Sequence, residues 1–588
     1  MSVLRVAFLI ENASFFKNIS YSNFFYGAYF DLVTIALLSL PLLIFVHPFV
    51  ARLNQTIKRI ISIIIKGYLA LISFFILFLN IWDIAYFSYT QKRSSFSYFW
   101  HILTGTETRS LVGEFLAEFW WLPVVFLVLS WALFKVIKAV HPFEENQGGK
   151  WPWGAYLLSV FLVIILARGG VQLRPVGIVD ATAMSSLEQA PIVLNTAFTV
   201  LKSINDKELH ELKYFKENEL ASLLHHPNTT LQGGLPPKTN VVIIILESFG
   251  TNYVGPQSPH SYAPFLDSLL KESLYFEYAI ANGRTSMDAV PAILGGMPSW
   301  LAESYILSNY CSNKLSSLPQ ILKSQGYSTS FYHGAKEGSM GFKSFTKAIG
   351  IDDYYGLESY PNPAHFDGNW GIWDHHMLNF FGKSLAKQKQ PFFSTVFTLT
   401  SHHPYKTPKV GFKNLQSGLE PLCKTISYTD QSLRSFFKRY CKSSWFENTL
   451  FVITADHVGP TRQNNFQTLD WRYRIPIAFY HPKIKIPYPN KGVVFQQIDI
   501  LPTLLDLLGI ERPKFQLGSS CYDDNQSMKM VYDNGNLISF NFDGTNLIPI
   551  AWTPGIKRQY TEQQKPVSQK MVALYQFYLN SLINNRSQ

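Results

Sequence analysis

Long apolar runs follow one another in the first part of the chain. Four of them reach the roughly 17–25 residues that a membrane-spanning helix needs, and they cover about residues 29–50, 61–86, 120–138 and 151–167. Each is flanked by Trp, Tyr, Lys or Arg, which anchor helices at membrane surfaces. Four such runs in succession, with little polar chain between them, favour a polytopic α-helical membrane segment over the core of a soluble domain.

Charged residues in and between these runs predict their orientation. Within the runs we single out Asp83 and Lys66, which lie near helix ends, where a charge can snorkel or pair. Short loops rich in Lys and Arg stay in the cytoplasm, and two loops here are basic: they carry Arg52, Lys58, Arg59, Lys135, Lys138 and Lys150. With both loops inside, the chain after Arg168 is extracytoplasmic.

With four crossings, this orientation leaves the N-terminus outside, which is awkward unless another helix precedes residue 29. Residues 1–16 hold an apolar stretch that is too short to cross, so we expect a fifth, N-terminal helix that is clipped or short here. A cleavable signal peptide is not expected, because the start lacks the basic, apolar and small-residue regions in that order.

The pattern changes after residue 167 and divides the chain into four parts. Residues 1–167 form the membrane region. Residues 168–238 open with "RGGVQLRPVG", continue with "ELHELKYFKENELASLLHH" and close on "GGLPPKTN", which predicts a juxtamembrane linker with helices. Residues 239–510 read as an α/β core. Residues 511–588 predict a small α+β subdomain with short antiparallel strands from "VYDNG" and "ISFNFDG" and a final amphipathic helix.

Two strands of the α/β core end in residues that can bind metal. Residues 241–246 are six consecutive apolar residues, mostly β-branched, and Glu247 follows them. Such a run predicts a strand of a parallel sheet that is buried on both faces, and ligands bind at the carboxyl ends of such strands. A second apolar strand ends in Asp456 and His457, whose carboxylate and imidazole suit Mn²⁺, Zn²⁺ or Mg²⁺. Taken alone, this pair also fits a capping Asp and a loop His.

A threonine stands at the start of a predicted helix. In "NGRTSMDAVPAIL", Thr285 or Ser286 can cap the helix, and Asp288 completes a capping box. A hydroxyl at this place also lies near amide donors that bind phosphate well. The pattern leaves open whether Thr285 is a cap, a nucleophile or both.

Five motifs in order resemble a known family. They are Glu247 at a strand end, "NGRTS" with Thr285, "SHHPY" with His402, "TADH" with Asp456 and His457, and "QIDILPTLLDLLG" at 497–509. Together they resemble the lipoteichoic acid synthase family of sulfatase-like phosphotransferases in the alkaline phosphatase superfamily. The resemblance implies an alkaline-phosphatase/sulfatase-like α/β domain with a mostly parallel central sheet and helices on both faces, carried by a multi-pass segment in a bacterial inner membrane.

The resemblance also implies a chemistry. Glu247, Thr285, Asp456 and His457 would bind one divalent metal, Mn²⁺ first and Zn²⁺ or Mg²⁺ as alternatives, with Thr285 as the nucleophile. A phosphothreonine intermediate would carry glycerol phosphate from phosphatidylglycerol to a glycan or lipid acceptor of unknown identity. Substrate-binding roles fall to His333, His402, Arg284 and Trp370.

The headgroup pocket departs from the family pattern. After His333 the Gram-positive enzymes carry an Asp, a Trp and an Arg that hold glycerol phosphate, whereas "AKEGSMGF" here has none of them. Asp367, Trp370 and Asp374 in "FDGNWGIWDHH" are candidate replacements, although an aromatic packing loop explains the segment equally well.

Three alternative functions remain to be weighed. A sulfatase needs Cys or Ser in a C/S-x-P-x-R context, which no cysteine here has. A phosphoethanolamine transferase shares the four ligands and is the first alternative, although that group commonly has several disulfides. A non-enzymatic, membrane-anchored binding or sensing protein is the second, although all four ligand positions hold competent residues.

Charge and cysteine content change this picture little. The net charge of +11 favours contact with anionic lipid headgroups over nucleic acid, because no basic stripe or nucleic-acid module is present. Four cysteines allow at most two disulfides, and Cys423 with Cys441 is the nearest pair.

Overall fold

The computed structural model divides the chain into two compact units, whose described residues end at 204 in the first and begin at 209 in the second, and each unit is described by itself. The described residues are 1–16, 19–45, 47–50, 53–90, 93–96, 99–100, 117–140, 153–171, 175–178, 180–185, 189–204, 209–224, 233–308, 310–311, 313–409, 411–489, 493–524, 526–554, 560–561 and 564–585. Arg52, Lys150 and most of residues 91–116 are not among the described residues.

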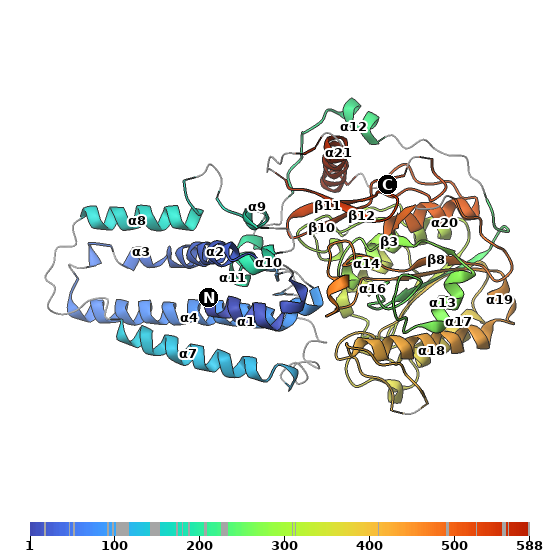
Figure 1. Ribbon diagram of the computed structural model, residues 1–588, viewed down its shortest axis with the longest axis horizontal. Coiled ribbons are helices and arrows are strands. Elements are labelled where there is room, and N and C mark those ends of the chain that lie inside the picture. The colour runs from blue at the N-terminus through green and yellow to red at the C-terminus, as the bar shows by residue number, and fades with distance from the viewer. Residues whose placement is uncertain are drawn as a thin grey trace. The chain divides into compact units, whose positions relative to one another are not determined.

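All the regular secondary structure among the described residues of the first unit is helical (Figure 1). Its longer helices are α1 (Ser2–Glu11), α2 (Ser22–Ser39), α4 (Gln55–Thr90), α7 (Trp121–Ala139) and α8 (Trp153–Arg168), and its short ones are α3 (Leu42–Phe45), α9 (Asp180–Met184), α10 (Ala190–Val193) and α11 (Thr196–Ser203). Within the described residues, α4 and α7 are long and apolar enough to cross a membrane, and α8 is a shorter apolar helix.

The first predicted run, residues 29–50, is not one helix. It is divided between α2 and α3 around Pro41, because proline cannot supply the amide hydrogen that a helix interior needs. The other three runs match α4, α7 and α8 to within a few residues, apart from α4, which is longer than expected. Apolar side chains such as Leu127, Trp131 and Phe134 on α7 are exposed, as expected for a helix that faces lipid. The number of crossings stays a prediction.

Two buried ion pairs hold this unit together. Arg5 on α1 donates to both carboxylate oxygens of Asp31 on α2, at 2.7 Å each. Asp83 near the end of α4 lies 3.6 Å from Arg93, so one charge that the sequence singled out is paired as expected. Asp31 was not singled out, although it interrupts the first apolar run. Lys66 donates to the carbonyl of Lys138.

The helices that follow α8 pack into the same unit. Asn195 donates to Asp31 and to Thr34, and the hydroxyl of the next residue, Thr196, donates to Asp83. Residues 190–203 are therefore fixed to both ion pairs, while residues from 207 onward belong to the second unit. The contacts divide the chain inside the predicted linker of residues 168–238, whose role as a linker stays a prediction.

A seven-stranded mixed sheet forms the centre of the second unit. Its strands are β1 (Asn240–Leu246), β2 (Leu274–Tyr275), β4 (Ser328–His333), β5 (Asp353–Tyr355), β6 (Phe392–Phe397), β7 (Thr449–Ala455) and β8 (Ile477–Tyr480), in the order β2-β8-β7-β1-β6-β4-β5. The strands from β7 to β5 pair in parallel, and β8 is antiparallel to β7 and β2. The sheet is mostly parallel, as predicted, with β8 as the exception.

Helices cover this sheet, and every residue of β1, β6 and β7 is therefore buried. α13 (Pro264–Lys271) and α17 (Asp374–Leu385) pack against α18 (Leu422–Tyr440), whereas α14 (Ser286–Gly295) packs against α15 (Leu318–Ser324) and α20 (Ile500–Leu508). In Figure 1, α17 and α18 run along one side of the sheet and α20 lies on the other. α16 (Phe342–Ala348) and α19 (Ser444–Glu447) complete the set. Single 3-10 turns lie at Ala13–Phe15, Tyr305–Leu307, Ser339–Gly341, Pro363–His365, Asn464–Phe466 and Gln497–Asp499.

The last part of the chain adds two small sheets. β3 (Tyr278–Ile280) pairs with β9 (Val494–Gln496), and β10 (Met530–Asp533), β11 (Asn536–Phe542) and β12 (Leu547–Trp552) form an antiparallel sheet. The first two strands of this sheet and the final helix, α21 (Gln564–Ile583), are the ones predicted. β12 was missed, because "LIPIAW" contains a proline, which is confined to edge strands. The boundary of a separate C-terminal subdomain stays a prediction.

Helix α21 holds the first described residues of this unit. Gln576 accepts from the amides of Tyr214 and Phe215, and Asn580 exchanges two hydrogen bonds with the backbone of Leu212. Of the helical stretch predicted over residues 208–226, the described residues are helical only in α12 (Glu217–Leu224), which packs against α21.

The four cysteines are free thiols. Cys423 and Cys441, the pair nearest in sequence, lie eighteen residues apart at the start and at the C-cap of α18. At a rise of 1.5 Å per residue they are about 27 Å apart, too far for a disulfide.

Candidate metal and phosphate site

The pairing of β1 with β7 brings the first candidate residues together. The two strands run in parallel with Leu246 opposite Ala455, so Glu247 and Asp456 leave the sheet at the same edge. Ligand atoms of Glu247, Asp456 and His457 all lie within 4.8 Å of one another. The amides of Ser248 and His457 both donate to Oδ1 of Asp456 at 2.7 Å, which fixes its carboxylate.

The charges of this cluster are not balanced by the protein. Glu247 is 2% and Asp456 0% exposed, and burial together with the charge of Asp456 raises the pKa of Glu247 well above its ordinary value. Among the ion pairs of the described residues, neither carboxylate is joined to a lysine or arginine. Two buried carboxylates without a cation are unfavourable, and a cation that binds between them removes this cost.

The imidazole of His457 fits the same conclusion. Its Nδ1 lies 3.1 Å from the carbonyl oxygen of Val458, which can only accept, so in the neutral ring Nδ1 carries the hydrogen. Nε2 then presents its lone pair 3.3 Å from Oδ2 of Asp456 and 3.7 Å from Oε1 of Glu247. A hydrogen bond from one ring nitrogen commonly orients the other toward a metal. These three residues therefore fit a divalent cation bound by oxygen and nitrogen.

Helix α14 begins at this cluster. Thr285 is its N-cap and forms a capping box with Asp288, as one of the open alternatives predicts. The Thr285 hydroxyl donates to Oδ2 of Asp288 at 2.9 Å. The neighbouring Ser286 hydroxyl donates to Oδ2 of Asp456 at 2.8 Å and to Oε2 of Glu247 at 3.2 Å. Ser286 thus contacts the carboxylates, whereas Thr285, the residue before it, is hydrogen-bonded to Asp288.

Ser286 is the residue that the sequence reasoning underrated. It was considered only as an alternative cap, because two adjacent hydroxyls before a helix give the same capping pattern. No local signal separates the two hydroxyls, because the contacts of Ser286 with Glu247 and Asp456 join distant parts of the chain.

Arg284 is buried rather than exposed on a loop. Its guanidinium lies 5.6 Å from the ring centre of Tyr473, and Nη1 makes no hydrogen bond among the described residues. Burial lowers the pKa of Arg284 to about 10, so the group is cationic at neutral pH. A buried cation with an unused donor beside Thr285 suits a bound anion.

Two candidate histidines gather at the same end of the sheet. His333 ends β4 and lies between the rings of Phe342 and Phe397, with both ring centres at 5.3 Å. Burial lowers the pKa of His333 to about 3. Burial, and then the imidazoles of His403, His457 and His333, lower the pKa of His402 to about 3 as well. Both rings are neutral hydrogen-bonding groups at neutral pH.

Trp370 reaches this end of the sheet from the loop before α17. Its ring centre lies 4.0 Å from that of His402, and Nε1 donates to the carbonyl of His403 at 2.5 Å. The other two replacements proposed for the family's headgroup residues have structural tasks. Asp367 accepts from the amides of residues 369, 370 and 371, and Asp374 accepts from the amides of Leu399 and Thr400.

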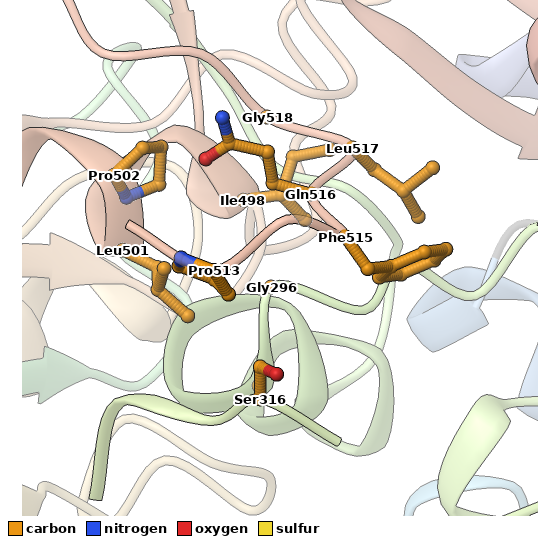
Figure 2. Close-up of a pocket in the computed structure, with 11 residues that line it drawn as sticks. Gly296, Ser316, Ile498, Leu501, Pro502, Pro513, Phe515, Gln516, Leu517 and Gly518 are labelled. Carbon is orange, nitrogen blue, oxygen red and sulfur yellow. The ribbon is translucent and has the colours of Figure 1, made fainter. Parts of the chain in front are cut away.

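Two cavities elsewhere contain none of these residues. Figure 2 shows a pocket of about 10 Å³ beside the C-terminal end of α14, lined by Gly296, Ser316 and the segments around Leu501 and Phe515. Such a volume holds at most one water. A larger cavity of about 410 Å³ is lined by Val494, Phe540 and other residues of the last small sheets and α21.

Comparison with known proteins supports the fold and the resemblance. Residues 239–510 match the sulfatase family. The lipoteichoic acid synthase of Staphylococcus saprophyticus is 25% identical over 389 residues, which cover 60% of this chain and 58% of that protein. Lipoteichoic acid synthase 1 of Bacillus subtilis is 25% identical over 384 residues, with 59% and 58% covered. The chain thus matches less than two thirds of the length of these relatives.

Two solved structures share the fold. An alkaline phosphatase superfamily protein from Vibrio parahaemolyticus superposes with a TM-score of 0.53 at 22% identity and covers 64% of this chain and 98% of its own. A lipoteichoic acid synthase from Listeria monocytogenes gives 0.52 at 20% identity and covers 63% and 99%. The predicted resemblance is confirmed.

Proposed function

Since residues 239–510 match the sulfatase family and share the fold of an alkaline phosphatase superfamily protein, we propose that the protein is a membrane-bound, metal-dependent phosphotransferase. It moves a phosphorylated headgroup, glycerol phosphate from phosphatidylglycerol, to an extracytoplasmic glycan or lipid acceptor through a phosphothreonine at Thr285. The observation that carries the proposal is the buried, uncompensated pair of Glu247 and Asp456 with His457 at the start of α14.

The metal would be held by Glu247, Asp456, His457 and the hydroxyl of Thr285, a set of oxygen and nitrogen ligands that suits Mn²⁺, with Zn²⁺ or Mg²⁺ as alternatives. When bound, the ion lowers the pKa of a hydroxyl ligand and balances the charge of phosphate oxygens. Ser286 holds the two carboxylates together through its hydrogen bonds to both.

The side chains around Thr285 perform the rest of the reaction. The Thr285 oxygen attacks phosphorus, the bond from phosphorus to the diacylglycerol oxygen breaks, and diacylglycerol leaves with a proton. An acceptor hydroxyl then attacks the phosphothreonine, the bond from phosphorus to the Thr285 oxygen breaks, and the threonine hydroxyl re-forms. Arg284 and the amides of the first turn of α14 face the phosphate oxygens, where a helix N-terminus stabilises negative charge.

The neutral histidines and Trp370 bind the headgroup in this proposal. His402 donates from Nδ1 to the carbonyl of His403, so its Nε2 is free to accept from a headgroup or acceptor hydroxyl. Trp370, in contact with His402, forms a wall of the same pocket and takes the place of the tryptophan missing after His333.

A direct test uses the full-length protein in detergent with Mn²⁺ and headgroup-labelled phosphatidylglycerol or phosphatidylethanolamine. Diacylglycerol release from phosphatidylglycerol is expected, with a loss of at least about 1,000-fold in Thr285→Ala and complete loss with EDTA, whereas Thr285→Ser retains activity. Release from phosphatidylethanolamine alone would instead establish a phosphoethanolamine transferase. No release from either lipid by folded, Mn²⁺-loaded protein would refute both and favour a binding protein.

We also propose that the domain lies outside a bacterial inner membrane, carried by several membrane helices. The exposed thiol of Cys441 offers the test. A membrane-impermeant maleimide should label it in spheroplasts, whereas Cys441→Ser should abolish most of the label. Labelling only after lysis would place the domain in the cytoplasm.

A further inference from the structure

A buried glutamine joins the loop that carries Thr285 to the strand that carries Asp456. Gln497 is 0% exposed and lies in the 3-10 turn before α20. Its Nε2 donates to the carbonyls of Ala455 at 2.9 Å and Asp456 at 2.7 Å, at the end of β7. Its Oε1 accepts from the amide of Asn282 at 2.8 Å, three residues before Thr285. One side chain thus bridges two segments 170 residues apart that both carry site residues.

Asn282 completes the bridge from the other side. Its Oδ1 accepts from the amide of Ile498, next to Gln497, at 3.0 Å, and its Nδ2 donates to Oε1 of Gln496 and to the carbonyl of Met530. Asn282 and Gln496 are fully buried. Every hydrogen-bonding atom of the Asn282 and Gln497 side chains is therefore used, which rigidifies a buried polar network.

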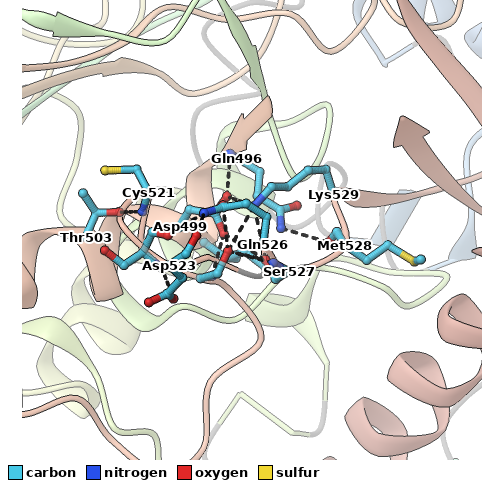
Figure 3. Close-up of polar contacts among 12 residues, drawn as sticks. Gln496, Asp499, Thr503, Cys521, Asp523, Gln526, Ser527, Met528 and Lys529 are labelled. Carbon is cyan, nitrogen blue, oxygen red and sulfur yellow. Dashed lines mark hydrogen bonds and ion pairs between the residues drawn. The ribbon is translucent and has the colours of Figure 1, made fainter. Parts of the chain in front are cut away.

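A second layer fixes the turn that carries Gln497. The amide of Gln496 donates to Oδ2 of Asp499, and Lys529 donates to the same oxygen at 2.6 Å. Figure 3 shows how Lys529 also meets Gln526 and Ser527, and how Gln496 reaches Met528. The motif "QIDILPTLLDLLG" thus begins with a glutamine whose turn is fixed by Asp499 and Lys529. Its side chain contacts the segments that carry Asp456 and Thr285.

We propose that Gln497 is a positioning residue for the phosphotransfer reaction. It sets the position of the Thr285 loop relative to Asp456, so that the nucleophile and the metal ligands meet in the geometry that attack on phosphorus needs. An error of about 1 Å between reacting groups can reduce a rate about 100-fold. This inference rests on the proposed function for its catalytic consequence, but the bridge itself is testable without turnover.

Two substitutions distinguish the contact of Gln497 with the β7 carbonyls from its contact with the Asn282 amide. Gln497→Met keeps the size of the side chain and removes all three hydrogen bonds. Gln497→Glu keeps an acceptor for the Asn282 amide but places a carboxylate oxygen against the carbonyls of Ala455 and Asp456. The glutamate variant should therefore disturb the contact with β7 and spare the contact with the Asn282 amide, whereas the methionine variant should disturb both.

Gln388 provides a matched control. Its Nε2 donates to Ser328 and Ser330 and its Oε1 accepts from Ser394, so it bridges β4 and β6 near their starts, at the opposite ends of the strands from the site. Gln388→Met removes a similar number of hydrogen bonds within the same sheet. It should change local stability there without any effect on Mn²⁺ binding or turnover.

Hydrogen exchange of the full-length protein in detergent tests the bridge first. In Gln497→Met, peptides covering residues 280–288 and 452–458 should exchange faster than in the parent, and in Gln497→Glu only the second should. In Gln388→Met the change should fall on residues 326–331 instead. Unchanged exchange of both site peptides in Gln497→Met would overturn the inference, whether or not the protein is a transferase.

Mn²⁺ binding and kinetics test the consequence. Isothermal titration with Mn²⁺ alone should show about 10- to 100-fold weaker binding by Gln497→Met, and kcat should fall with KM for the lipid nearly unchanged, neither of which a loss of stability by itself produces. Parent-like Mn²⁺ affinity and kcat in a Gln497→Met protein would refute the positioning role. If the parent itself binds none of Mn²⁺, Zn²⁺ and Mg²⁺, the proposed function fails, and the exchange data alone decide on the bridge.

Discussion

Two clusters of buried charge in this chain are built on opposite plans. In the helical unit, Asp31 and Asp83 each face an arginine, and hydroxyl or amide groups satisfy their remaining oxygens. In the second unit, Glu247 and Asp456 face each other, with an imidazole lone pair between them. In the first cluster, the protein itself supplies the positive charge that balances each carboxylate. In the second, neither carboxylate is paired with a lysine or arginine among the described residues.

The difference separates structural from functional charge without reference to any relative. A buried ion pair is costly to form, yet removing one partner is costlier still, because the other charge is left alone. An excess of buried negative charge has the opposite response, since removing one carboxylate relieves repulsion. The sign of the stability change on neutralising one residue therefore distinguishes the two plans.

The largest effect should come from Asp456→Asn. The asparagine oxygen can still accept from the amides of Ser248 and His457, but one ligand charge is gone, so Mn²⁺-dependent turnover should fall at least about 1,000-fold. In EDTA the melting temperature should not fall, because the repulsion of Glu247 is relieved. A clear loss of stability in EDTA would show that the cluster is structural.

The next effect should come from Arg5→Leu in the helical unit. It leaves Asp31 buried and unpaired, and we expect a loss of about 3–5 kcal/mol in the free energy of unfolding, measured by denaturation in detergent. The double variant Arg5→Leu/Asp31→Leu should recover most of it. Mn²⁺ affinity should stay at the parent value in both. Equal instability of the single and double variants would contradict the pairing argument.

A smaller effect is expected for Ser286→Ala. The loss of the hydroxyl that contacts both carboxylates should weaken Mn²⁺ binding about 10- to 100-fold, and excess Mn²⁺ should restore turnover. Thr285→Ala should not be restored in this way. If Ser286→Ala were as inactive as Thr285→Ala at saturating Mn²⁺, Ser286 rather than Thr285 would be the nucleophile.

The smallest effect concerns pH and His333. Its folded-state pKa is lowered to about 3 from the ordinary 6.5, so as the pH falls through 6.5 the unfolded state takes up the proton first. The stability that neutral His333 contributes above pH 6.5 is then lost progressively as the pH falls to about 3. Between pH 7 and pH 5 this amounts to about 2 kcal/mol. His333→Gln should remove that part of the loss, measured by unfolding in EDTA at both values, and an unchanged pH dependence would contradict it.

The sequence predicted the parts of this molecule that depend on local pattern. A run of β-branched residues followed by one carboxylate is enough to predict β1 and Glu247 at its end, and the same holds for β7 with Asp456 and His457. Parallel pairing then brings the strand ends together, because neighbouring parallel strands share their carboxyl edge.

What the sequence did not predict depends on contacts between distant residues. The Arg5–Asp31 pair joins two helices, and Gln497 finds its partners 41, 42 and 215 residues away. No spacing rule predicts such partners. Two local features were also misjudged: Pro41 divides the first apolar run, and a continuous helix, α18, separates Cys423 from Cys441.

The hold of α21 on residues 209–215 also has a mechanical consequence. A pull on the chain at the entrance of the second unit acts first on the hydrogen bonds to Gln576 and Asn580. It is then carried by α21 and the antiparallel sheet beside it, rather than by β1, whose first residue comes only twenty-five residues later. The last helix of the unit thus bears a force applied at residues 209–215 before that force reaches the strand ends at Glu247 and Asp456.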